Sequence, residues 1–182
     1  MMLGAIRRVT ISCTHLEAME HAYGEYLGYQ VSSRGAITQT EADAWGAPAM
    51  AGAANLSMQP AVGNDFEFRF VAGATYPDYV PLTTYGWNAS EIMVENVDAM
   101  AERVANSPFK IVGEPRNLSF SDDIRAMQLC GPANEIVYLT EFKNPVPGLS
   151  VPTPRSPVDR TFIVILGGGS MHELQDFYHN TF

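Results

Sequence analysis

Hydrophobic and polar residues change their spacing along this chain in a pattern that repeats. Residues 6–13 form a short β-branched run that is typical of a strand. Over residues 16–27 the apolar positions recur at helical spacing, which predicts a helix with one buried stripe. Thr14 with Glu17 fits a capping box at its start, and Gly28 can adopt the left-handed conformation that ends a helix. We therefore predict a strand followed by a helix.

The same pattern returns in the middle of the chain. Residues 90–94 are strand-like, residues 97–104 carry the next helical stripe, and Asn96 is a suitable N-cap. Residues 39–47 predict a further short helix. The remaining strand signals are residues 29–33, 53–58 and 65–71 in the first unit and residues 109–112, 125–130 and 135–142 in the second. Each unit therefore reads strand, helix, then three strands.

A third copy of the pattern begins after a proline-rich stretch. Residues 160–166 predict a strand, and Ser170 with Glu173 fits the start of a helix. We divide the chain into a first unit at 1–75, a second at 76–143, a linker at 144–158 and the start of a third unit at 159–182. Because half a unit cannot bury both faces of its strand, we hypothesise that this unit is truncated and the protein has four units. The alternative is that the half unit docks on a partner chain.

Composition excludes several classes of function. The formal net charge is −9, from 11 basic and 20 acidic residues, which disfavours nucleic-acid and anionic membrane partners. No run of about 18 apolar residues predicts a membrane span, and the first residues lack the layout of a signal peptide. Cys13 and Cys130 lie in predicted strands, where buried free thiols are expected. We expect a cytoplasmic protein.

Two segments resemble a known superfamily. RRVTISCTHLEAMEHAYGEYLGYQV (residues 7–31) is similar to the first strand and helix, and CGPANEIVYLTEF (residues 130–142) is similar to the closing turn and strand, of glyoxalase, bleomycin-resistance and extradiol dioxygenase (vicinal oxygen chelate) proteins. The resemblance implies an α+β fold, in which tandem βαβββ units form a half-open mixed β-barrel with flanking helices. It also implies a small-molecule site in the cup between paired units.

The superfamily's metal-dependent members place His and Glu ligands at the starts of first strands and in closing strands. The matching positions in this chain are Arg8, Ala89 with Asn88 beside it, Tyr138, and Arg69 or Glu67. Arginine and alanine offer a cation no ligand, whereas a divalent ion needs about three protein ligands. We interpret the four histidines as surface or capping residues. The sequence therefore predicts neither a metal nor another cofactor in this pair of units.

Strand alternation predicts which side chains face the cup. In one interpretation, Arg8–Glu67 and Arg69–Glu91 are structural ion pairs that bridge strands. In the other, Tyr138, Glu67 and Glu91 are candidate acid and base groups of a ligand pocket. The ligand-binding residues would then be Arg8, Thr10, Arg69, Met93 and Gln128. The aromatic residues Trp45, Trp87, Tyr76, Tyr79 and Tyr85 are either stacking walls at its opening or loop anchors.

Three functions remain in competition. The first is metal-free binding of a small organic molecule, as in bleomycin-resistance proteins. The second is a lyase, isomerase or dioxygenase-like enzyme of catabolism or detoxification, with any metal site in a missing C-terminal half. The third is a structural or regulatory domain whose cup is filled. The partner implied by the first two is a small molecule, and the resemblance also makes a homodimer one arrangement to expect.

Overall fold

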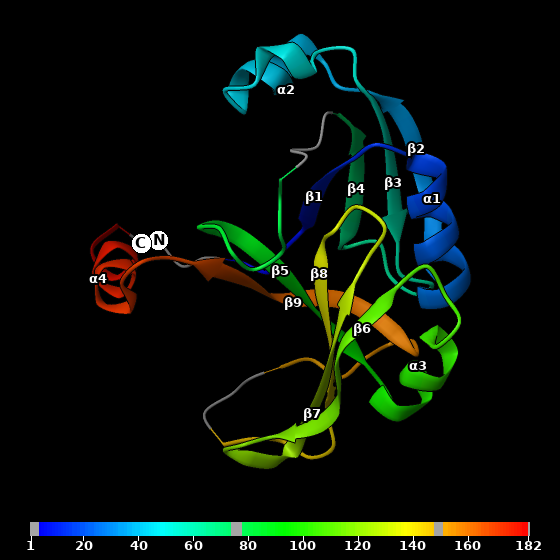
Figure 1. The fold of residues 1–182 in the computed structure, drawn as a ribbon, viewed down its shortest axis with the longest axis vertical. Coiled ribbons are helices and arrows are strands. Elements are labelled where there is room, and N and C mark those ends of the chain that lie inside the picture. The colour runs from blue at the N-terminus through cyan, green and yellow to red at the C-terminus, as the bar shows by residue number, and fades with distance from the viewer. Residues whose placement is uncertain (1–3, 74–77, 148–150, 182) are drawn as a thin grey trace.

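The computed structural model describes residues 4–73, 78–147 and 151–181. Figure 1 shows two open sheets, with α1 (Leu16–His21) and α3 (Val97–Val104) close together on one side of the molecule. A hydrogen bond from the Arg103 guanidinium to the backbone carbonyl of Glu25 links the two helical segments at 2.7 Å. The arrangement agrees with the expected α+β class built from tandem βαβββ units. The expected boundary between residues 75 and 76, Tyr76 and Phe182 lie outside the described residues.

The first unit forms a four-stranded mixed sheet. Its strand order is β1-β4-β3-β2, with β1 parallel to β4 and the other pairs antiparallel. A π-helical turn, η1 (Ala22–Tyr26), extends the first helix as far as the apolar stripe predicts. The other elements are β1 (Arg8–Cys13), α1 (Leu16–His21), β2 (Gln30–Ala36), α2 (Gln39–Ala44), η2 (Pro48–Met50), β3 (Ala54–Gln59) and β4 (Glu67–Ala72).

The second sheet has five strands in the order β6-β7-β8-β5-β9. The fifth strand, β9 (Val158–Gly167), comes from the beginning of the third unit and pairs antiparallel with β5 (Gly86–Val94). On its other side β5 pairs in parallel with β8 (Ile136–Phe142). The remaining elements are α3 (Val97–Val104), β6 (Lys110–Leu118), β7 (Ser121–Cys130) and α4 (Met171–Thr181). All predicted strands and helices are present, although several strands, most of all β6, are longer than expected.

One apolar core joins the two units. The ring of Tyr23 is fully buried and lies edge-on to Phe68 and Phe70 of its own unit and to Phe109 of the second unit. Residues of α3, β7 and β8 belong to the same buried cluster. Aromatic pairs of this kind contribute about 1 kcal/mol each beyond the area they bury. The helix-covered faces of both units therefore pack on each other.

Local capping explains where the helices begin and end. Asn96 caps α3 as predicted, accepting a hydrogen bond from the Ala99 backbone N–H at 2.8 Å, and Gly28 has a φ of 76°. The predicted capping box of Thr14 and Glu17 is wrong. His15 occupies the cap position and makes no side-chain cap, so Thr14 lies one residue too early. A complete capping box instead starts α2, where Thr38 and Glu41 exchange hydrogen bonds.

Asp65 ties the third unit to the first. Its carboxylate forms ion pairs with Arg155 in the linker, at 2.8 Å, and with Arg160 in β9. The Tyr29 hydroxyl donates a hydrogen bond to the backbone carbonyl of Asp159 in the same region. The flanking arginines hold the pKa of the Asp65 carboxyl below its ordinary value. These contacts fix β9 in place even though it enters a different sheet.

We predict that Asp65→Asn lowers the free energy of unfolding by about 1–3 kcal/mol at pH 7, because Arg160 loses its ion-pair partner and Arg155 keeps only Asp159. Urea denaturation measures the change. The matched control is Glu20→Gln, which breaks the exposed Arg34–Glu20 pair and should cost less than about 1 kcal/mol. Equal losses in the two variants would show that Asp65 is an ordinary surface charge.

Candidate functional site

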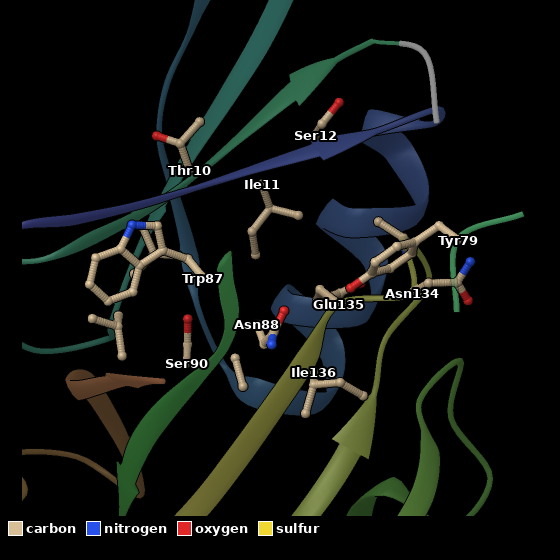
Figure 2. A pocket seen from close by; sticks show the side chains of 14 residues that line it. Thr10, Ile11, Ser12, Tyr79, Trp87, Asn88, Ser90, Asn134, Glu135 and Ile136 are labelled. Carbon is tan, nitrogen blue, oxygen red and sulfur yellow. The ribbon is translucent and has the colours of Figure 1, made fainter. Parts of the chain in front are cut away.

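A cleft lies between the two sheets, where the middle of β1 passes the start of β5 and the turn before β8. It encloses about 250 Å³. Figure 2 shows Glu135 and Asn88 between the rings of Trp87 and Tyr79. We call it the interunit cleft. Its lining is Val9, Thr10, Ile11, Ser12, Tyr79, Trp87, Asn88, Ala89, Ser90, Ala133, Asn134, Glu135, Ile136 and Val164.

Glu135 is the acidic group of the interunit cleft. Its Oε1 accepts a hydrogen bond from the buried hydroxyl of Tyr23 at 3.1 Å, and its Oε2 accepts one from the Ala133 backbone N–H at 2.8 Å. Burial raises the pKa of this carboxyl to about 7, although the hydrogen bonds oppose the shift. A Cβ atom on Gly131 would stand 1.9 Å from Oε1. A glycine at this turn therefore makes room for the carboxyl group.

A larger cavity lies over the second sheet, on the face turned away from α3. It encloses about 680 Å³. Two residues of the proline-rich linker, Val146 and Pro147, close one side of it. We call it the apolar hollow. The rest of its lining is Glu91, Leu118, Phe120, Ser121, Asp123, Ile124, Phe142, Phe162 and Ile163.

Glu91 is a half-buried carboxyl at the edge of the apolar hollow. Its Oε1 accepts a hydrogen bond from the Thr140 hydroxyl at 2.7 Å, and Thr140 is itself fully buried. Burial raises the pKa of Glu91, while the Thr140 hydrogen bond lowers it. None of the ion pairs among the described residues includes Glu91. The carboxyl therefore keeps its proton more readily than an exposed glutamate and can take part in proton transfer.

The predicted site residues fall into two groups on different sheets. Thr10 lines the interunit cleft, and Glu91 lines the apolar hollow. Arg8 and Glu67 form an ion pair at a third, shallow depression beside Asp65. The Arg8–Glu67 ion pair expected in the first interpretation is present, because β1 and β4 place the two residues opposite each other.

The expected Arg69–Glu91 pair is wrong. Arg69 is buried and pairs with Glu41 of α2 at 2.8 Å, with its guanidinium 5.6 Å from the centre of the Trp45 ring. Glu91 lies on the other sheet. The physical reason is that α2 brings its own carboxylate over the first sheet, and Arg69 together with Thr38 holds the pKa of Glu41 at about 2.

Tyr138 is the neighbour of Glu91 in the β5–β8 ladder and of Gln128 in the β7–β8 ladder, so alternation placed these three side chains on one face correctly. Met93 is fully buried. Tyr138, Gln128 and Met93 do not line the interunit cleft or the apolar hollow. The eight predicted residues therefore do not share one pocket among the described residues, because β5 takes β9 as its neighbour and leaves the first sheet separate.

Sequence reasoning did not single out Glu135 or Phe120. Glu135 is the one acidic residue at the start of a predicted apolar strand, and that position was the only sequence signal for a functional role. Among the aromatics, Trp87 and Tyr79 border the interunit cleft, whereas Trp45 packs on Arg69. Cys13 and Cys130 are free thiols as expected, but only Cys13 is buried as predicted, and Cys130 is partly buried. Burial raises the pKa of Cys13 to about 11.

The residues that the sequence resemblance put at metal-ligand positions offer a divalent ion few ligands. They are Arg8, Ala89 and Tyr138, with Glu67 engaged by Arg8. Within residues 4–73, 78–147 and 151–181 no group of three or more His, Cys, Asp or Glu side chains is placed to hold a metal. The described helices also include none long and apolar enough to cross a membrane.

Comparison with family models and with curated proteins gives no match. Solved structures do match. A glyoxalase family protein from Bacillus cereus superposes with a TM-score of 0.60 at 16% identity, covering 79% of this chain and 97% of its own. A member of the glyoxalase/bleomycin resistance protein/dioxygenase superfamily from Sphaerobacter thermophilus covers 78% and 99%, with a TM-score of 0.52 at 15% identity.

The chain has the glyoxalase fold. Glyoxalase I from Zea mays extends the likeness into the third unit, covering 96% of this chain with a TM-score of 0.62 at 15% identity. The match takes in 53% of the maize chain, so this glyoxalase-fold chain spans about half of that enzyme's length. The shorter bacterial proteins are matched along almost their entire lengths.

We predict that the carboxyl of Glu135 makes stability depend on pH. A carboxyl with a folded pKa of about 7, above its ordinary value, stabilises the fold fully below the ordinary value. That contribution is lost as pH rises toward 7, and it amounts to about 3 kcal/mol. Between pH 5 and pH 8 the native protein should lose unfolding free energy relative to Glu135→Gln, measured by urea denaturation. Parallel stability curves for the two proteins would rule the effect out.

Proposed function

We propose that this glyoxalase-fold protein binds a small, mainly apolar organic molecule in the apolar hollow, without a metal ion. The observation that carries the proposal is the hollow itself. Its volume of about 680 Å³ falls within the roughly 300–1,000 Å³ of small-molecule sites. Its lining is largely aliphatic and aromatic and contains few polar groups, the composition that ligand pockets share.

Three phenylalanines suit the apolar hollow to a flat or ring-shaped ligand. The rings of Phe142 and Phe162 lie 5.5 Å apart and edge-on to each other. Phe120 lines the same space and is 77% exposed. An aromatic side chain so exposed is costly to leave in water, and a bound ligand would cover it. We therefore favour a ligand with an unsaturated or aromatic body.

Glu91 supplies the hollow with a polar contact. In its protonated form the carboxyl can donate a hydrogen bond to a carbonyl or hydroxyl oxygen of the ligand while it keeps the bond from Thr140. The solved structures with this fold include a named enzyme, glyoxalase I from Zea mays. That likeness supports a small-molecule function but leaves the choice of ligand to the hollow's own side chains.

A second candidate function is metal-independent proton transfer on the bound molecule. The observation that favours it is a carboxyl of raised pKa that faces an apolar cavity. Glu91 would then remove a proton next to a carbonyl group and return it elsewhere, as in an isomerase. Exchange of substrate protons for deuterium in heavy water, lost in Glu91→Gln, would support catalysis over simple binding.

We predict that Phe120→Ala weakens binding of the neutral fluorescent probe N-phenyl-1-naphthylamine by at least about fivefold, because roughly 1–2 kcal/mol of apolar burial is lost. Fluorescence titration measures the dissociation constant. Tyr85→Ala is a matched control, since Tyr85 is 79% exposed and lies outside the lining of the hollow. If both variants bind the probe as the native protein does, the apolar hollow is not the binding site.

We also predict that affinity for the same probe falls as rising pH ionises Glu91. Burial raises the pKa of Glu91, so the carboxyl ionises at a higher pH than an exposed glutamate, and a charge beside an apolar ligand is unfavourable. Glu91→Gln, which stays neutral, should bind with little dependence on pH. A pH profile that is unchanged by the substitution would assign the titration to another group.

A further inference from the structure

The interunit cleft carries one formal charge, and that charge is negative. Glu135 is its acidic residue, and its other lining residues are neutral or apolar. The eight ion pairs among the described residues do not include Glu135. The two groups that bond its carboxyl, the Tyr23 hydroxyl and the Ala133 N–H, are uncharged. An ionised Glu135 therefore faces the cleft without a counter-ion in the described part of the chain.

The fold holds this carboxyl at a fixed point. Tyr23 is fully buried in the core, and Ala133 lies in the turn that closes the second unit. Both hydrogen bonds use acceptor sites of the carboxylate and favour its charged form. Each oxygen keeps a further lone pair that can accept a donor from the cleft. The group is thus positioned and partly satisfied, with capacity left for a ligand.

Aromatic rings stand at both sides of the acid. Trp87 and Tyr79 line the interunit cleft, and Figure 2 shows them on opposite sides of Glu135 and Asn88. Trp87 is 65% exposed, so its ring is available to solvent. Trp is the aromatic side chain that attracts cations most strongly, at about 0.5–2 kcal/mol. Two aromatic rings and a carboxylate in one cleft all favour a positively charged ligand.

We propose that the interunit cleft binds a small organic ammonium ion, with Glu135 as its counter-ion and Trp87 and Tyr79 as aromatic walls. A metal ion fits less well, because a single carboxylate falls short of the three or so protein ligands that a divalent cation requires. The volume of about 250 Å³ equals that of about eight water molecules, which suits a compact amine. Asn88, Ser90 and Thr10 offer neutral hydrogen-bonding partners for the rest of the guest.

This site is separate from the apolar hollow of the proposed function. Ala89 and Ile136 line the interunit cleft, whereas Glu91, two residues further along β5, lines the hollow. The hollow takes its lining from β5, β6, the turn after β6, β7, β8, β9 and the linker, and includes no residue of the first unit. One ligand could therefore bind in the absence of the other, and the two proposals can fail independently.

Binding of an ammonium ion should depend on the ionisation of Glu135. Among the described residues, the titratable groups around it are Tyr23, Tyr79, Cys13 and Cys130, with Glu17 and Lys110 acting on the two thiols from further away. Burial raises the pKa of the Tyr23 hydroxyl and of both thiols, so these groups stay neutral near pH 7. With a pKa of about 7 for Glu135, the ionised fraction, and so the affinity, should rise about tenfold from pH 6 to pH 8.

The test uses tetramethylammonium, choline and ethylammonium, with 3,3-dimethylbutan-1-ol as the uncharged isostere of choline. Isothermal titration of the full chain should show saturable binding of at least one cation, tighter at pH 8 than at pH 6, and no binding of the alcohol. Proton release on binding at pH 7 should appear as a dependence of the measured heat on buffer. Equal affinity for choline and the alcohol overturns the proposal. So does the absence of binding by all three cations up to about 100 mM, a dissociation constant that corresponds to a binding free energy of about −1.4 kcal/mol.

Two variants locate the site. Glu135→Gln should abolish ammonium binding, and Trp87→Leu, at an exposed position that leaves the core intact, should weaken it several-fold. Trp45→Leu removes the other tryptophan, which packs on Arg69, and Glu91→Gln alters the apolar hollow; both should bind ammonium as the native protein does. Native affinity in Trp87→Leu together with loss in Trp45→Leu would place the site elsewhere, whatever happens to the folding of Glu135→Gln.

Discussion

The pairing of β5 with β9 is the constraint on which the arrangement of both cavities depends. A strand has two hydrogen-bonding edges, and β5 uses one for β8 and the other for β9. The first sheet therefore cannot join the second through backbone hydrogen bonds at β5. It is attached instead by side chains, through the core around Tyr23 and the ion pairs of Asp65. The interunit cleft is the space left where those side chains do not fill the gap.

The carboxyl groups of Glu91 and Glu135 lie in different cavities and have different surroundings. Glu91 accepts one hydrogen bond, from a hydroxyl group, and otherwise faces an apolar cavity, which favours its protonated form. Glu135 accepts two hydrogen bonds, which support its ionised form against the burial that raises its pKa to about 7, and it faces polar and aromatic residues. Burial raises the pKa of each. The same residue type is thereby suited to an apolar ligand in one place and to a cation in the other.

Much of the fold was predictable from the sequence because the responsible signals are local. The helical stripe at residues 97–104, the Asn96 cap and the turn at Gly28 depend on neighbours within a few residues. Face assignment also succeeded within a sheet, as the row of Glu91, Tyr138 and Gln128 shows. The choice of strand partner was not predictable in this way, since β9 lies more than 60 residues after β5 in sequence.

The candidate site was predicted less well for the same reason. Arg69 was expected to pair with Glu91, but α2 packs over the first sheet and places Glu41 beside Arg69 instead. No local sequence pattern indicates that contact. Glu135 looked like an ordinary first residue of a strand until Tyr23, 112 positions earlier, was found to bond it. Residues whose roles come from distant elements require the three-dimensional structure.

The position of Val146 and Pro147 in the wall of the apolar hollow has a consequence for how such a protein can diversify. A connecting segment is free to change length and composition far more readily than a paired strand. Insertions or deletions after Phe142 would reshape one side of the cavity while every sheet hydrogen bond stayed in place. Ligand preference in this architecture can therefore change through changes in the linker, while the strand pairs that hold the cavity open stay the same.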